Sequence, residues 1–112
     1  MASPLGQVST LSVAALPQGA ATVLNVTSAT VIKASAGTLL AVNVIAAGSS
    51  NGTINDAASV ATSGAANAVA VINSGTDVVP GALNAIPEGG WPVANGIVVN
   101  TGTGQIVSVL YK

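Results

Sequence analysis

Short runs of apolar and β-branched residues, separated by Gly, Pro, Ser and Asn, recur along most of this chain. The clearest run covers residues 38–46, where alternation predicts a β-strand. Its two predicted faces are Leu40, Val42 and Val44 on one side, and Leu39, Ala41, Asn43 and Ile45 on the other. Further strands are expected at residues 22–27, 29–34, 53–58, 68–73, 96–100 and 105–111.

The segments between these runs are rich in turn-forming residues. The sequence Thr-Gly-Thr-Gly at 101–104 predicts a hairpin between the last two runs. Residues 59–67 are small and polar, which indicates a loop, although the alanines of 57–66 also permit a short helix. Residues 74–90 form a long connection that contains Gly and Pro. Turns about every 8–12 residues, without a convincing amphipathic helix, predict an all-β domain: a small antiparallel β-sandwich or barrel.

The first 21 residues differ from the rest of the chain. They contain Pro4, Gly6, Pro17 and Gly19, a composition that favours an extended N-terminal arm with at most one edge strand. Residues 22–112 are then expected to form a single β-sandwich domain. Within the arm, Leu5, Val8 and Leu11 are candidate contacts with a partner, because they are apolar side chains in an irregular segment.

Formal charge is almost absent. Only Lys33, Lys112, Asp56, Asp77 and Glu88 carry it, and the chain has no His, Cys or Arg. An ordinary soluble domain carries about 25% charged residues, whereas this one carries 4%. Most catalytic mechanisms need a titratable base, an activated nucleophile or metal ligands. We therefore expect no catalytic residue, no cofactor and no metal site, and favour a structural or assembly role.

The remaining chemical motifs have simpler interpretations. The three carboxylates are scattered, so an acid–base pair is not expected; Gly102-Thr-Gly104 lacks the lysine and helix of a phosphate-binding loop. Asn51, Asn55 and Asp56 fit turn chemistry better than a calcium loop. Two lysines cannot neutralise a run of phosphates, which argues against nucleic-acid binding. No apolar stretch reaches the roughly 18–20 residues of a membrane-spanning helix.

Two aromatic side chains are candidate contact residues. Trp91 is either a core plug or an interface anchor, and the high average burial of Trp favours the first. Tyr111, next to the C-terminal residue, fits either position. The strongest predicted strands also have almost none of the lysines, inward charges or prolines that usually protect sheet edges, since Lys33 and Asp56 are the only charges within a predicted strand. Either the sheet closes on itself or another subunit covers it, and binding through such a surface should depend only weakly on salt.

Several segments together resemble the small decoration proteins, also called staple or cement proteins, of short-tailed double-stranded DNA bacteriophage capsids. They are TVLNVT at 22–27, GTINDAA at 52–58, WPVANGIVV at 91–99 and GTGQ at 102–105, and the resemblance covers about residues 22–112. It implies a jelly-roll-like sandwich on the outer surface of an icosahedral virion, made in the cytoplasm of a bacterial host. Many copies, as homodimers or higher assemblies, would bind the major capsid protein and bridge neighbouring capsomers, without an active site.

Two other classes of function stay open at this point. One is a head-fibre tip or carbohydrate-binding adhesion module, which would use Trp91 or Tyr111 for stacking on sugars. The other is a self-assembling fibre subunit, which low charge and strong β-propensity would favour.

Overall fold

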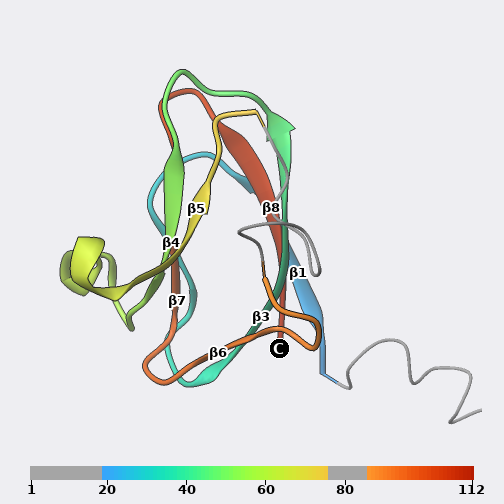
Figure 1. Cartoon of the computed structure of the whole chain (residues 1–112), viewed down its shortest axis with the longest axis vertical. Helices are drawn as coiled ribbons and strands as arrows, with labels where there is room; N and C mark the ends of the chain where they lie inside the picture. Colours follow the sequence, from blue (N-terminus) through green and yellow to red (C-terminus); the bar gives the residue numbers. More distant parts are fainter. Residues whose placement is uncertain (1–18, 76–85) are drawn as a thin grey trace, which may run out of the picture.

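The β-strands of this chain form two antiparallel sheets that pack face to face, as the sequence predicts (Figure 1). The computed structural model describes residues 19–75 and 86–112. The described strands are β1 Ala21–Val26, β2 Thr30–Lys33, β3 Gly37–Ala46, β4 Gly52–Asp56, β5 Ala68–Ile72, β6 Trp91–Val93, β7 Ile97–Asn100 and β8 Ile106–Tyr111. Their order is β1-β8-β3-β6 in the first sheet and β2-β7-β4-β5 in the second, which confirms the small β-sandwich.

The described strands pair in a nested pattern. β1 pairs with β8, β2 with β7, β3 with β6 and β4 with β5, all antiparallel. The first four strands therefore run beside the last four, like the two arms of one long hairpin wound into two layers. Of the described consecutive strands, β4 and β5 alone share a sheet, and every other connection crosses between the sheets.

The prediction of a hairpin between the last two strands is wrong, because these two strands do not pair with each other. β7 lies in the second sheet and β8 in the first, so residues 101–105 carry the chain across the sandwich. The turn itself exists, because the Gln105 amide donates to the Gly102 carbonyl at 3.0 Å. The backbone amide of Ser49, in the connection between β3 and β4, donates to the Thr103 carbonyl at 2.8 Å. This hydrogen bond holds the turn against that connection. Turn residues specify a reversal here, and not which strands pair.

The core lies between the two sheets and is built almost entirely from aliphatic side chains. Alternate positions of each strand point inward, as the two-residue period of a strand requires. The buried cluster comprises Val26, Ile32, Leu39, Val42, Ile54, Ile72, Ile86, Val93, Ile97, Val99, Val107 and Val109.

The face predicted for Leu39 is also wrong. Leu39 lies opposite Tyr111 and Ala41 lies opposite Leu110, so Leu40 is an extra residue in β3. Such a β-bulge breaks strict alternation. As a result Leu39 joins Val42 in the buried core, while Leu40 is buried outside that cluster.

The helix that the sequence permits at residues 57–66 does not form as an α-helix. Two 3₁₀ turns occupy this connection, Val60–Thr62 (η1) and Ala65–Asn67 (η2). The extended Gly64, with φ of −177°, separates them. Side chains also compete for the backbone: Ser63 Oγ donates to the Val60 carbonyl at 2.7 Å, and the Gly64 amide donates to Asn67 Oδ1 at 3.0 Å.

Candidate functional site

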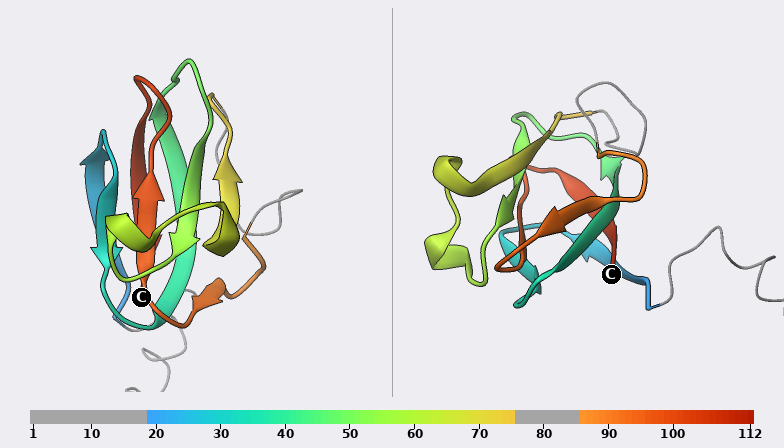
Figure 2. Two further views of the ribbon diagram at one scale, coloured as in Figure 1. Left: turned by 90° about the vertical axis from the view of Figure 1, so that its left-hand side faces the viewer. Right: turned by 60° about the horizontal axis from the view of Figure 1, so that its bottom comes forward.

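The outer face of the second sheet is covered by the chain's own connection between β4 and β5. This connection crosses in front of the sheet in the left view of Figure 2. Asn55 on β4 and Val98 on β7 lie opposite each other on this face. Although both point away from the core, Asn55 is 1% exposed and Val98 is fully buried. The cover therefore removes the centre of this face from solvent.

A hydrogen-bond network built around Asn55 holds the cover in place. Asn55 Oδ1 accepts from Thr53 Oγ1 and from Asn100 Nδ2, both at 2.9 Å. Its Nδ2 donates to the Gly64 carbonyl at 2.7 Å and to Asn67 Oδ1 at 3.1 Å. Among the described residues, no buried side-chain nitrogen or oxygen lacks a partner. This network therefore has a structural role, because the hydrogen-bonding groups of the Asn55 side chain are already paired within the chain.

The outer face of the first sheet has a different character, and we call it the uncharged face. Cross-strand pairing places Leu110 beside both Thr22 and Ala41, and Ser108 beside Asn43. The side chains of this face are Thr22 and Leu24 from β1, Ala41, Asn43 and Ile45 from β3, and Ile106, Ser108 and Leu110 from β8. None carries a formal charge, and each is at least partly exposed among the described residues. A solvated sheet face is usually polar.

Two large apolar side chains stand out on the uncharged face. Leu24 is 71% exposed and Ile45 is 65% exposed, the highest values for large apolar residues in the described part of the chain. Both occupy irregular positions, since β1 shifts register between Val23 and Val26, and β3 shifts register between Val44 and Ala46. Beside Leu24, Asn25 adopts a left-handed φ of 57°, which Asn tolerates better than most residues. The bulges therefore present Leu24 and Ile45 to solvent.

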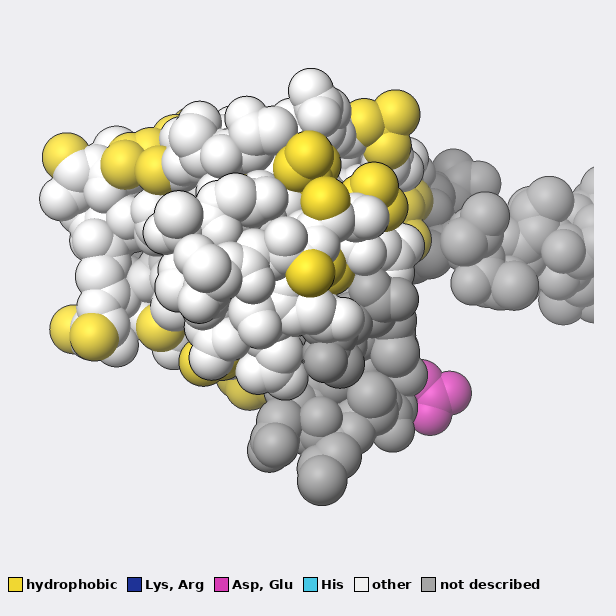
Figure 3. Space-filling view, turned by 90° about the horizontal axis from the view of Figure 1, so that it is seen from above, with side chains coloured by type: hydrophobic (Ala, Val, Ile, Leu, Met, Phe, Trp, Pro, Cys, Tyr) yellow, Lys and Arg dark blue, Asp and Glu magenta, His cyan; other side chains and the backbone are white. Residues whose placement is uncertain are grey.

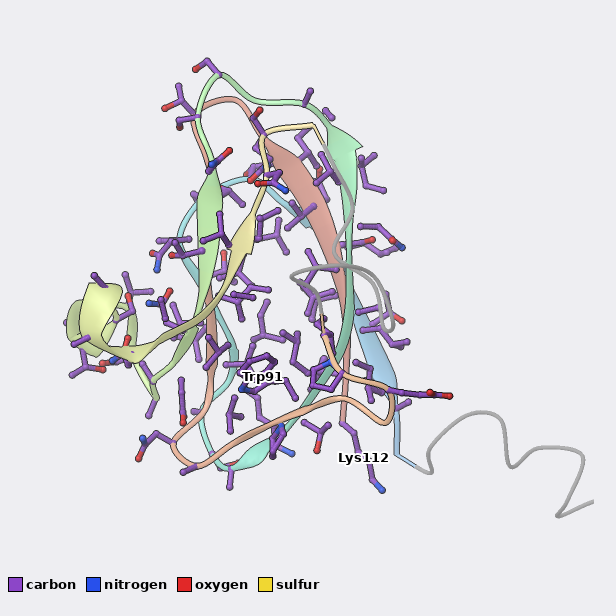
Figure 4. All side chains as sticks on the ribbon, in the orientation of Figure 1. Trp91 and Lys112 are labelled. Atoms are coloured by element: carbon purple, nitrogen blue, oxygen red, sulfur yellow. The ribbon has the colours of Figure 1, made fainter. Side chains whose placement is uncertain are left out.

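Three of the four described charged residues, Lys33, Asp56 and Lys112, lie towards one end of the sandwich. Gly37 packs against both the Lys33 side chain and the Lys112 carbonyl, and Thr38 and Lys112 exchange two backbone hydrogen bonds of 2.8 Å. Figure 4 shows Lys112 at this lower end. Figure 3, seen from the opposite end, shows apolar and neutral polar side chains, no Lys or Arg, and one acidic side chain at the margin of the view.

The Asp56 carboxylate, at the charged end, is hydrogen-bonded to the backbone of the turn between β6 and β7. Its carboxylate accepts the backbone amides of Asn95 at 2.7 Å, Ala94 at 3.0 Å and Gly96 at 3.3 Å. Desolvation raises the pKa of Asp56, but these hydrogen bonds together lower it more, so the net pKa lies below the ordinary value of 3.8. Asp56 is thus an ionised brace for the turn between β6 and β7.

The structure brings two of the sequence-predicted contact residues together. Leu39 lies opposite Trp91 on one side and opposite Tyr111 on the other. Both aromatic side chains are half-buried and pack against the core cluster, and Figure 4 shows Trp91 between the two sheets. Trp91 therefore has a core-edge position. Leu5, Val8 and Leu11 lie outside the described residues.

Sequence reasoning missed Leu24, Ile106 and Leu110 as candidate contacts. It did place Ala41, Asn43 and Ile45 on a shared face of the strand at 38–46. That uncharged row of alternate residues was the available signal, but alternation alone does not say whether such a face meets water, a core or a partner.

The chemistry of the described residues is limited. They include no group of three or more His, Cys, Asp or Glu that could hold a metal ion. They also contain no helix that is long and apolar enough to cross a membrane. No protein family, curated protein or solved structure matches the chain. The surface is consequently the feature from which a function can be argued.

Proposed function

We propose that this chain is a non-enzymatic structural protein of a virion. In this role it binds the major capsid protein on the outer surface of an icosahedral shell and stabilises the shell by bridging neighbouring capsomers. The observation that carries the proposal is a set of exposed large apolar side chains on a surface with little charge: Leu24, Val31, Ile45, Val60 and Val71. Apolar side chains that gather on one face, as Leu24 and Ile45 do with Ile106 and Leu110, mark a site where another protein binds.

The strand pairing supports the same role. The nested pattern β1–β8, β2–β7, β3–β6 and β4–β5 is the connectivity we assign to a jelly roll. Jelly rolls occur in viral capsid proteins, and also in lectins and cupins. Because one fold hosts many functions, the fold agrees with the proposal while the surface carries it.

Repetition on a lattice would supply the binding strength. Each copy offers a modest contact surface, but a dimer or higher assembly that engages several shell subunits gains from a high effective concentration. Because the described residues include only four formal charges, such contacts would rest on apolar burial and neutral hydrogen bonds. The proposal therefore includes weak salt dependence.

Two observations make the competing functions less suitable. Trp91 uses part of its ring surface against the core, which leaves less of it for stacking on a sugar. The sheet edges are also blunted against fibre growth: β1, β2 and β5 each take part in a register shift, and Pro92 interrupts the three-residue β6. Bulges, short strands and proline are common protections of edge strands.

A sedimentation gradient of lysate from the native source tests the proposal. The chain, followed by mass spectrometry, should sediment with DNA-filled particles at high copy number and should stay with them at high salt. Recovery of the chain only as free dimers or as filaments would contradict a virion role.

A further inference from the structure

We infer that the uncharged face is the surface that meets the shell, and that the contact patch on the shell is itself apolar and free of charge. This inference rests on the proposed function and assigns the orientation of the bound protein. The first sheet would lie flat on the shell, and the covered second sheet would face away from it.

The contrast between the two sheets favours this orientation. The outer face of the second sheet is already buried at its centre, because Asn55 and Asn100 bind the connection that covers it. Its exposed apolar residues Val31 and Val71 lie on the two outermost strands, with β7 and β4 between them. Among the described residues no connection covers the uncharged face, and all of its side chains are at least partly exposed.

The charge of the face specifies the chemistry of its partner. A charged group pressed against this face would lose its water and would meet no opposite charge among the described side chains, which is costly. Asn43 and Ser108 lie opposite each other near its centre and offer neutral donors and acceptors. The matching patch must therefore be apolar, with uncharged hydrogen-bonding groups opposite this pair.

Leu24 and Ile45 are the expected anchors of the contact. They lie on β1 and β3, on either side of β8, and they are the most exposed large apolar side chains described. Burying them against an apolar patch removes hydrocarbon from water, whereas a lysine at either place would bring an unpaired charge into the contact.

Matched lysine variants test this orientation on intact particles. Leu24→Lys and Ile45→Lys alter the uncharged face, and Val31→Lys and Val71→Lys place the same charge on the second sheet. Each purified chain is titrated onto particles that lack it, and bound protein is measured after pelleting. We expect the first pair to lose at least about tenfold in affinity and the second pair to bind like the wild type. Thermal unfolding of each variant shows whether it is folded.

The outcomes separate the two levels of the proposal. If wild-type chain does not bind the particles, the proposed function falls and the orientation falls with it. If wild type binds and folded Leu24→Lys and Ile45→Lys bind equally well, only the orientation is overturned. Loss of self-association in these variants, with particle binding unchanged, would instead make the face a contact between copies and would also overturn the inference.

Discussion

Asn100 on β7 donates its side-chain amide to Asn55 Oδ1 on β4 at 2.9 Å, on the outer face of the second sheet. Through Asn55, this contact extends to the Gly64 carbonyl at 2.7 Å in the connection above the sheet. One sheet thereby acquires a cover from its own chain, whereas no connection in residues 19–75 and 86–112 covers the outer face of the other. The difference between the two faces underlies the proposed orientation on a shell.

Asn55→Ala should destabilise the fold strongly. It removes two accepted and two donated hydrogen bonds at a buried position, so that Asn100 Nδ2 keeps only Ser63 Oγ and the Gly64 carbonyl keeps only the Asn67 amide. Each lost hydrogen bond costs about 0.5–1.5 kcal/mol net, so we expect the four together to lower the free energy of unfolding by about 2–4 kcal/mol. Urea denaturation measures it. Asn43→Ala, on the uncharged face, is the control and should change stability by less than about 0.5 kcal/mol; equal losses would contradict the assigned network.

The buried side chain of Gln105 links the β7–β8 connection to the segment that follows β5, and we expect this link to stabilise the fold. It is fully buried, its Oε1 accepts from the Gly102 amide at 3.0 Å, and its Nε2 donates to the Asn73 carbonyl at 2.9 Å. Gln105→Met keeps most of the volume but leaves both backbone groups unpaired. The expected loss is about 2–3 kcal/mol by thermal or urea unfolding. An unchanged midpoint would show that these backbone groups find other partners.

Gly102 should tolerate no side chain. A Cβ at this position would overlap the carbonyl oxygen of Ser50, whereas a Cβ at Gly64 would meet nothing within 4 Å. We expect Gly102→Ala to cost about 3 kcal/mol or more, because backbone atoms must move, and Gly64→Ala to stay within about 1 kcal/mol of the wild type. The two melting temperatures test this. Similar values for both variants would contradict the packing of the β7–β8 connection against residues 50–51.

Asp56 makes stability depend on pH in a defined direction. The lowered folded pKa of Asp56 means that its ionised form stabilises the fold above the unfolded pKa, near 3.8, and that this contribution is lost as the pH falls towards the folded value. Asp56→Asn should therefore be less stable than the wild type at pH 7. The difference should shrink below about pH 4. Parallel urea titrations from pH 2 to pH 7 measure it, and a constant difference across that range would exclude the assigned role.

The strands themselves were largely predictable from the sequence. Alternation in residues 38–46 marks β3, which the structure extends by one residue to Gly37. The expected strands at 53–58, 68–73 and 105–111 likewise overlap β4, β5 and β8. Each of these signals is local, because β-branched residues and flanking turns act within a few positions.

The pairing of the strands, and the face to which each residue points, were harder to predict from the sequence. The glycines at 102 and 104 predict a reversal equally well for a hairpin and for a crossover, and contacts with residues distant in sequence, such as Ser49, decide between them. The bulge at Leu40 depends on its pairing with Tyr111 and Leu110, so the alternation of β3 alone could not reveal that Leu39 faces the core. The uncharged face was hidden for the same reason, since it joins residues from three distant segments.

Binding to particles should be nearly independent of salt. The uncharged face contains no formal charge, so Coulomb attraction contributes little for added salt to screen. Raising the salt concentration from 0.05 M to 1 M should change the bound fraction of chain by less than about threefold in a pelleting assay. A decrease of tenfold or more would show that charged groups dominate the contact.

Electron cryomicroscopy of particles that carry the chain would show directly where the protein sits and which sheet meets the shell. We expect density for a β-sandwich on the outer surface of the shell, with β1, β8 and β3 against it and the covered β2-β7-β4-β5 sheet facing solvent. Particles without such density would contradict the virion role, and a sandwich bound through the second sheet would contradict the proposed docking face.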